Sequence, residues 1–173
     1  MFSKLMPCFN LARMDEQTKQ ARWAEARTYL DWSMSLCHKQ VRLGKYFIFE
    51  HPAGAASWER QSVQAVADLD GTQVVKFDMC RFGMMSPDGS QPLQKPTKVM
   101  TNMPNVQQQL NNRRCSCTVP HKPIRGTQCG IAVSRHAQVY PFKFCAALLM
   151  GIQEFIAPDE PFPELPTLSG CVW

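Results

Sequence analysis

The stretch from Lys45 to Trp58 constrains the fold of this chain more than any other part of the sequence. Four apolar residues in succession, Tyr46 to Phe49, do not alternate with polar ones. We therefore predict a buried strand that is covered on both faces, as in a parallel sheet beneath helices. Glu50 follows where this strand is expected to end, and a turn of small residues comes next. Because ligands bind at the carboxyl ends of parallel strands, Glu50 is the first candidate for a functional site.

A long helix is predicted before this strand, from Asp15 to Leu43. Its apolar residues recur at intervals of three and four, which indicates one amphipathic stripe. The stripe consists of Trp23, Ala26, Leu30, Met34, Cys37 and Val41. Gly44 is expected to end the helix. A helix that leads directly into a buried strand is typical of half a right-handed crossover unit.

The rest of the chain continues to alternate between helices and strands. Ser57 is predicted to cap a second helix that reaches Leu69. Strands are expected over 73–78 and 98–101, helices after Asn102 and over 141–155, and loops over 79–96 and 112–139. These elements predict an α/β fold: a partial Rossmann-like layered sheet of three or four strands with flanking helices and a long Cys/His/Arg-rich loop.

At 173 residues and 45% hydrophobic content, the chain is long enough for one domain with a real core. We assign residues 1–155 to this domain and residues 156–173 to a disordered, acidic, Pro-rich tail. A sheet this thin would leave an edge open for a missing segment or a partner. No apolar run approaches the ~20 residues that span a bilayer. The scattered cysteines indicate a reduced, intracellular protein of nucleus or cytoplasm, with no membrane partner.

Positive charge is concentrated in the second half of the chain. Residues 76–143 contain ten Lys/Arg against two Asp, a local excess of +8 within a net charge of +5. One interpretation is a surface for nucleic acid, either DNA or RNA. The other is an ordinary solvated surface, and the sequence leaves both open. The candidate nucleic-acid-binding residues are Arg81, Lys95, Lys98, Arg113, Arg114 and Arg125.

Cys115, Cys117, His121 and Cys129 form a candidate metal site, with His136 further along. Structural zinc takes four such ligands in tetrahedral geometry, usually from two knuckles. Here the first pair has C-x-C spacing, which is tighter than the usual knuckle. Zinc is therefore possible, and a surface loop without metal is the alternative.

Other chemistries find less support in the sequence. The chain has no GxGxxG or GxxxxGK[ST] motif, which argues against independent binding of a dinucleotide or nucleoside triphosphate. Cys37 and His38 are neighbours on a predicted helix and would point to different faces, so Cys37 is assigned to the core. Glu50 has two interpretations: a carboxyl group that reads a base edge, or a strand-end acid paired with Lys95 or Arg81.

Several spaced motifs resemble a domain of retroelement polyproteins of dinoflagellate type, which also carry integrase and reverse transcriptase. The motifs occupy residues 49–53, 57–58, 77–84 and 95–102, followed by Cys115 to His121 and by residues 137–141. That domain is in turn distantly similar to the catalytic half of cytosine-C5 DNA methyltransferases.

The resemblance implies that Glu50 matches the carboxylate that holds the target base in those enzymes, although their Glu-Asn-Val is replaced by Glu50-His51-Pro52. The family's Arg-x-Arg pattern is absent. Longer relatives read Cys-Pro-Pro-Cys-Thr-Met-Phe-Ser at the nucleophile loop, whereas this chain begins Met1-Phe2-Ser3. The resemblance therefore implies a chain that opens after the nucleophile and lacks the S-adenosylmethionine cradle.

The expectation is thus a catalytically silent fragment of a mobile-element polyprotein domain that binds nucleic acid weakly. It would use no cofactor alone, and S-adenosylmethionine only if a missing N-terminal half or another polyprotein segment supplied the site. The alternatives are a zinc-stabilised module for interaction or nucleic-acid binding, and half of a split methyltransferase.

Overall fold

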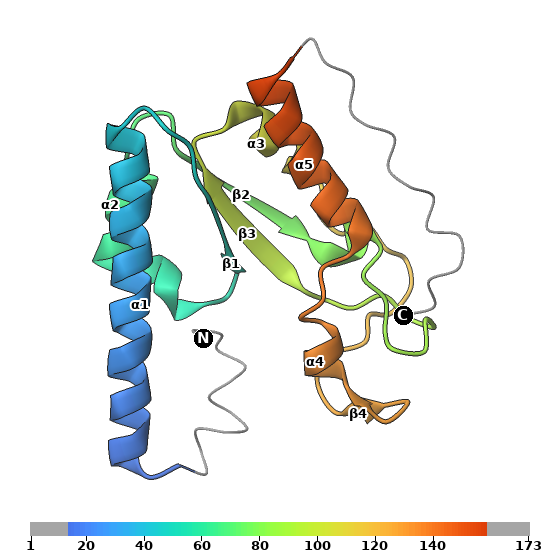
Figure 1. Ribbon diagram of the computed structural model, residues 1–173. Coiled ribbons are helices and arrows are strands. Elements are labelled where there is room, and N and C mark those ends of the chain that lie inside the picture. Colours follow the sequence, from blue (N-terminus) through green and yellow to red (C-terminus); the bar gives the residue numbers. More distant parts are fainter. Residues whose placement is uncertain (1–13, 159–173) are drawn as a thin grey trace.

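The computed structural model describes residues 14–158, which form three layers (Figure 1). A three-stranded sheet lies between two helical layers. One layer contains α1 (Glu16–Arg42) and α2 (Gln61–Ala67), and the other contains α3 (Pro104–Leu110) and α5 (Phe142–Ile156). The strands of the sheet, in spatial order, are β1 (Ile48–Pro52), β3 (Pro96–Thr101) and β2 (Gln73–Asp78). The predicted class, α/β in layers, is confirmed at this level.

The prediction of a parallel sheet was wrong. β3 lies between β1 and β2 and pairs antiparallel with both. An apolar run reports burial on two faces but not strand direction, and helices cover both faces of this antiparallel sheet. Glu50 pairs in register with Val99 in the middle of β1, not at its end. Tyr46 precedes β1 and is 45% exposed, although it was expected to be buried.

Two apolar cores lie on opposite faces of the sheet. Adjacent residues of β3 divide between them, since Val99 packs in the core beneath α3 and α5 and Met100 in the core beneath α1 and α2. Both side chains are fully buried. The same alternation continues in β1, where Ile48 faces the first core and Phe49 the second. Each fully buried large apolar side chain stabilises the fold by about 1.5–3 kcal/mol. Both helical layers therefore contribute to stability, because each covers one of the two cores.

The helix before the sheet follows the prediction. Asp15 accepts a hydrogen bond from the Thr18 backbone N–H at 2.8 Å and caps the N-terminus of α1. Gly44 follows the helix with φ +65°, a conformation that glycine adopts at no steric cost. The stripe of α1 residues predicted to be buried includes Leu30 and Met34, both in the core.

The second helix differs from its prediction. Ser57 lies inside a short 3₁₀ helix, η2 (Ala56–Glu59), and does not cap α2. The backbone is extended at Arg60, which separates η2 from α2. Ser57 and Trp58 are buried here, and the Trp58 indole N–H donates to the Pro52 carbonyl at 2.9 Å. That bond fixes the chain as it leaves β1.

The two segments predicted as loops contain structure. Residues 79–96 begin with a 3₁₀ helix, η3 (Met79–Phe82), and supply buried Met84 and Leu93 to the core. Residues 112–139 contain a small hairpin, β4 (Thr127–Gln128) with β5 (Ile131–Ala132), and a one-turn helix, α4 (Val133–His136). These elements are too short for periodicity to reveal them.

The expected start of the chain after a nucleophile loop and most of the expected flexible tail lie outside residues 14–158. Within the part of the chain that the structure describes, no helix is long and apolar enough to cross a membrane. β1 and β2 are the outer strands of the three-stranded sheet, so each has one edge without a strand neighbour among the described residues.

Candidate metal centre

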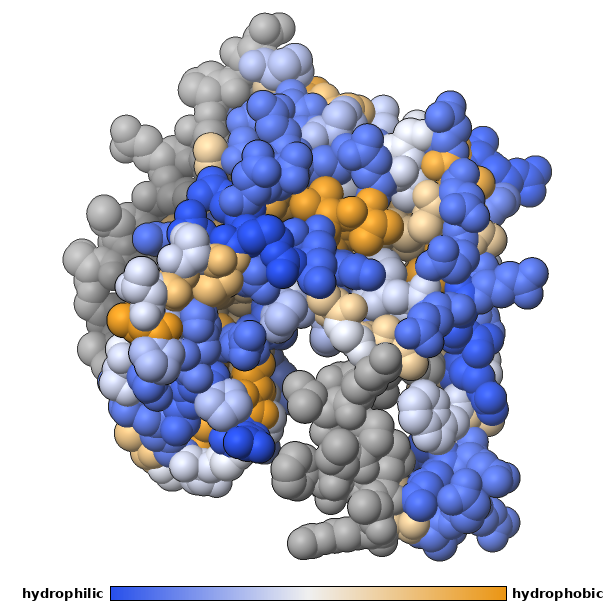
Figure 2. All heavy atoms as spheres, turned by 180° about the vertical axis from the view of Figure 1, so that it is seen from behind, coloured by the Kyte–Doolittle hydropathy of each residue, from blue (hydrophilic) through white to orange (hydrophobic). Residues whose placement is uncertain are grey.

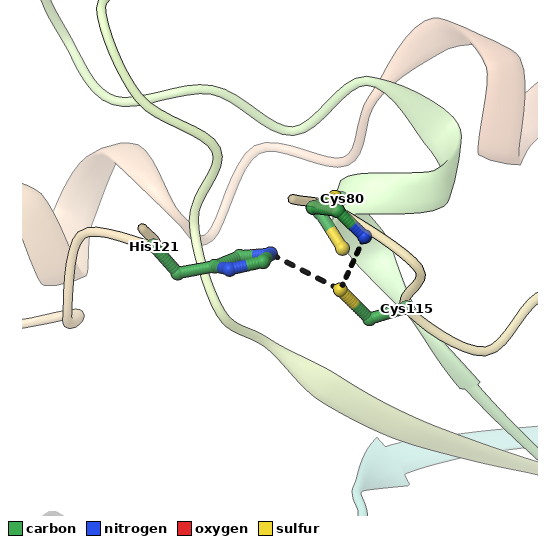
Figure 3. Close-up of side chains that lie close together, drawn as sticks. Cys80, Cys115 and His121 are labelled. Carbon is green, nitrogen blue, oxygen red and sulfur yellow. Dashed lines mark hydrogen bonds between the residues drawn. The ribbon is translucent and has the colours of Figure 1, made fainter. Parts of the chain in front are cut away.

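Three cysteines and one histidine converge beside the end of β2. Cys80, Cys115, Cys117 and His121 each offer one ligand atom, and these four atoms lie within 4.8 Å of one another. Figure 3 shows Cys80, Cys115 and His121 pointing toward one another, Cys80 from one segment of the chain and the other two from a second segment. These four residues, which we call the Cys₃His cluster, could hold a metal ion.

Backbone hydrogen bonds hold the segment that carries three of these ligands. Before the ligands, the Asp78 N–H donates to the Arg113 carbonyl at 3.0 Å. After them, the Lys122 N–H donates to the Pro92 carbonyl at 2.9 Å. Asp78 directly precedes η3, which carries Cys80, and Pro92 lies in the segment that follows η3. Backbone hydrogen bonds thus help to bring the ligands together.

The Cys115 sulfur is the most strongly engaged atom of the cluster. It lies 3.3 Å from His121 Nε2 and accepts a hydrogen bond from the Cys117 backbone N–H at 3.4 Å. That N–H favours the thiolate and lowers the pKa of Cys115. Burial raises the pKa of the neighbouring Cys80 to about 12, and the adjacent cysteines add to the shift. Burial thus favours the neutral thiol at Cys80, whereas the Cys117 N–H favours the thiolate at Cys115.

The donor set fits a tetrahedral cation. Zn–S bonds of about 2.3 Å and Zn–N bonds of about 2.0 Å in tetrahedral geometry place S and N roughly 3.5 Å apart. The 3.3 Å between Cys115 Sγ and His121 Nε2 is close to that separation. Thiolate and imidazole are also the ligand types found in tetrahedral structural sites. The residues present thus suit a closed four-ligand site.

Polar groups around the cluster orient its ligands. The Asp78 carboxylate accepts the Cys115 backbone N–H at 2.8 Å and lies 3.3 Å from Arg114 Nε. Arg81 Nη1 donates to Ser116 Oγ at 2.7 Å. Asp78 is buried, so its ion pair with Arg114 compensates a carboxylate that has lost water. Such outer contacts hold metal ligands in place.

The structure retains three of the four sequence-predicted ligands and adds one. Cys129 lies apart from the cluster in the turn between β4 and β5, exposed and with φ +51°. Cys80, which is not among the ligands predicted from the sequence, takes the fourth place. His136 instead places Nε2 3.0 Å from the Met85 carbonyl oxygen. The one sequence signal for Cys80 as a ligand is its position two residues after a predicted strand.

Glu50 lies in a second polar group, on the face of β1 toward α5. Its Oε2 accepts a hydrogen bond from the Tyr140 hydroxyl at 2.6 Å, while Oε1 is buried with no hydrogen-bond partner. Lys95 Nζ lies 5.0 Å from the Tyr140 ring centroid and donates to the Ala137 carbonyl at 2.8 Å. Burial lowers the pKa of Lys95, whereas the Glu50 carboxylate acts in the opposite direction. Burial raises the pKa of the Tyr140 hydroxyl, and its hydrogen bond to the Glu50 carboxylate raises it further.

The candidate nucleic-acid-binding residues do not gather on one face. Lys98 lies over the Trp58 ring at 5.1 Å, in the layer of α1 and α2. Arg113 lies over Phe82 at 5.8 Å, near the Cys₃His cluster with Arg81 and Arg114. Arg125 is exposed, between the cluster and the β4–β5 hairpin. The positive charge therefore divides into a group around the cluster and single residues elsewhere.

Comparison of the chain with protein-family models, with curated proteins and with solved structures found no significant match.

Proposed function

We propose that the chain is a zinc-stabilised module for interaction or nucleic-acid binding, with one Zn²⁺ held by the Cys₃His cluster. The observation that carries this proposal is the convergence of four ligand atoms from two distant segments. Zinc would lower the pKa of the bound thiols and hold residues 113–122 against η3. The site is closed by four protein ligands, which makes its role structural.

Positive charge around this site favours nucleic acid as the ligand. Arg81, Arg113, Arg114, Lys122 and Arg125 lie within or beside the ligand-bearing loop. Asp78 compensates one of these charges. A metal-stabilised loop would present the remaining cations on a fixed surface, which suits phosphate contacts that depend on salt.

Metal content tests the zinc proposal directly. We expect about one zinc per purified full-length chain, loss of that zinc in Cys80→Ser, and retention in Cys129→Ser. Both substitutions replace cysteine with serine. A difference in zinc content between them therefore distinguishes the Cys₃His cluster from the ligand set predicted by sequence, which has Cys129 in place of Cys80. If Cys80→Ser unfolds, cobalt titration of the refolded wild type supplies a second readout, namely the absorption of tetrahedral thiolate-bound Co²⁺. A zinc-free wild type, or stoichiometric zinc in folded Cys80→Ser, contradicts the proposal.

A second candidate function follows from Glu50, and we propose it separately. The resemblance to methyltransferase-like retroelement domains implies a carboxylate that holds a base. Glu50 Oε1 is a buried acceptor without a donor, and a base amino group could supply one. In this role the chain would bind a nucleotide through the Glu50 carboxylate.

Fluorescence anisotropy with a labelled single-stranded oligonucleotide tests both nucleic-acid proposals. Affinity should fall steeply as salt is raised. Glu50→Gln should weaken binding several-fold if Oε1 accepts from a base, whereas Glu154→Gln on α5 should not change it. Equal affinities for the two variants would contradict the role of Glu50. The absence of salt-dependent binding would remove nucleic acid as the ligand.

A further inference from the structure

The Cys₃His cluster contains three thiols that lie close enough together to be oxidised in pairs. The ligand atoms of Cys80, Cys115 and Cys117 all lie within 4.8 Å of one another. A disulfide joins its two sulfurs at about 2 Å, so any pair of them bonds after a movement of no more than about 3 Å. Cys129, which is also exposed, lies outside the cluster.

Cys115 is the sulfur of this cluster that an oxidant in solution reaches first. Its residue is exposed, whereas Cys80 is half-buried. Every residue from 111 to 120 is exposed, and most of them are polar. Hydrophilic side chains also dominate the face of the molecule that Figure 2 shows, where the hydrophobic patches are small. A small hydrophilic oxidant such as hydrogen peroxide therefore meets Cys115 directly from water.

The surroundings of Cys115 favour the thiolate, which is the form that reacts with peroxides. Its sulfur accepts the Cys117 backbone N–H at 3.4 Å and lies 3.3 Å from His121 Nε2. That N–H lowers the pKa of Cys115, whereas the Asp78 carboxylate acts in the opposite direction. Arg114 Nε lies 3.3 Å from Asp78 and offsets part of its charge. Cys115 is therefore the reactive nucleophile of the cluster.

Cys80 suits Cys115 as a disulfide partner better than Cys117 does. A bond between Cys115 and Cys117 would close a small ring around a single residue, which restricts the geometry that a disulfide prefers. Cys80 approaches from a separate segment and closes no such ring. Burial raises the pKa of Cys80, but a bound zinc ion holds its cysteine ligands as thiolates.

We propose that a peroxide oxidises Cys80 and Cys115 to a disulfide and thereby releases the zinc ion. This inference rests on the proposed zinc site, since only a bound metal is released. The site would then respond to oxidants as well as stabilise the fold.

The reaction takes two steps. The Cys115 thiolate attacks one peroxide oxygen, so that an S–O bond forms, the O–O bond breaks and the departing hydroxide takes a proton from solvent to become water. The Cys80 thiolate then attacks the Cys115 sulfur. The S–S bond forms as the S–O bond breaks, and the second hydroxide is also protonated to water. The two sulfurs together lose two electrons, which reduce the peroxide.

The disulfide leaves too few ligands to retain the metal. Only Cys117 and His121 remain, whereas structural zinc takes four ligands. The new bond still joins residue 115 to η3, as the metal did, but residues 117–121 lose their attachment. A thiol reductant reverses the bond by exchange, so zinc should bind again after reduction.

Zinc release and disulfide mapping test the proposal with the full-length, zinc-loaded protein. Metal content is measured first, and a few equivalents of hydrogen peroxide are then added with a chromogenic zinc chelator. We expect about one zinc released for each disulfide formed, and rebinding after treatment with dithiothreitol and zinc. Cys129→Ser should release zinc at a rate within about twofold of the wild type, because Cys129 lies outside the cluster.

Trypsin identifies the bonded pair once free thiols have been alkylated. It places Cys80 in peptide 77–81 and both loop cysteines in peptide 115–125. We expect these two peptides to be linked, with fragmentation assigning the bond to Cys115. Cys117→Ser should still form the link, and Cys115→Ser should not. If either variant fails to fold, fragmentation of the wild-type peptide decides the pair by itself.

Three outcomes would overturn the proposal. Zinc-loaded protein that keeps its metal and free thiols in excess peroxide has a purely structural site, and the zinc proposal then still stands. An internal disulfide in peptide 115–125 without a link to 77–81 shows that Cys117 is the partner. Protein purified without zinc contradicts the zinc site and its release together, and the same mapping then decides separately whether Cys80 bonds to Cys115.

Discussion

Two individual residues of this protein limit the conditions and the substitutions under which it stays folded. His51 lies in β1 and stacks on Phe49, with ring centroids 5.8 Å apart. Gly151 lies where α5 crosses α3. His51 restricts the pH range over which the fold is stable, and Gly151 lies at a position where the size of the side chain is restricted.

We predict that His51 makes stability depend on pH. Burial lowers its pKa from 6.5 to about 4 in the folded state. Between those values the unfolded chain binds the proton and the folded chain does not, so stability is lost as pH falls from about 6.5 toward 4. Part of the ring remains accessible, which limits the loss to about 1–2 kcal/mol. Urea unfolding at pH 7 and pH 5 should show a smaller difference for His51→Gln, and equal differences would contradict the prediction.

We predict that Gly151→Ala destabilises the protein although alanine favours helices. An added Cβ would lie 2.7 Å from Val106 Cα and 2.9 Å from Val106 N, and backbone atoms cannot move aside cheaply. Overpacking of this kind costs about 1–3 kcal/mol. Thermal unfolding measures the effect. Gly54→Ala is the control, because its Cβ meets nothing within 4 Å, and a loss no larger than that of the control would argue against close packing of α3 on α5.

At the scale of elements, β1 is held at its start by the residues that follow β3. The Phe47 N–H donates to Asn102 Oδ1 at 3.0 Å, and Asn102 Nδ2 donates to the Lys45 carbonyl at 2.9 Å. The Thr101 hydroxyl also donates to the Phe47 carbonyl at 2.5 Å. These side chains extend the pairing of β1 beyond the strand itself.

We predict that Asn102→Ala destabilises the protein by about 1–3 kcal/mol, because it removes two hydrogen bonds to the backbone at once. Chemical denaturation gives the free energy of unfolding. Gln108→Ala, an exposed position on α3, should cost no more than a few tenths of a kcal/mol. Equal stability of the two variants would show that water replaces the Asn102 amide.

At the scale of the whole molecule, the Cys₃His cluster lies beside one of the two cores. Met79 and Phe82 flank Cys80 in η3 and pack in the core with α3 and α5. The core beneath α1 and α2 lies on the opposite face of the sheet. Metal loss should therefore loosen one layer before the other.

We predict that chelation exposes the ligand-bearing loop to trypsin first. This loop and its flanks contain the trypsin sites Arg113, Arg114 and Arg125, so early cleavage after these residues is readily assigned by mass spectrometry. Fragments that retain α1, β1 and α2 together should persist longer. Cys80→Ser should be cut in the same order without chelator. Unchanged cleavage after chelation, or cleavage in α1 first, would contradict a structural metal in this loop.

Local patterns in the sequence were sufficient to predict α1 with both of its ends, β2 and α5. Periodicity, capping residues and glycine act over a few neighbouring residues, so they can be read along the chain. The same holds for the close spacing of Cys115, Cys117 and His121, which made them candidate ligands with a metal-free loop as the alternative.

Only the tertiary structure decided the direction of β1 and β2, the place of Cys80 and the partner of Glu50. Strand direction depends on which strand pairs with which, and β3 follows the other two in the chain yet lies between them. Cys80 meets Cys115, and Glu50 meets Tyr140, because the sheet and helices carry distant segments to one place. Such contacts result from packing of the whole chain, and no short stretch of sequence contains them.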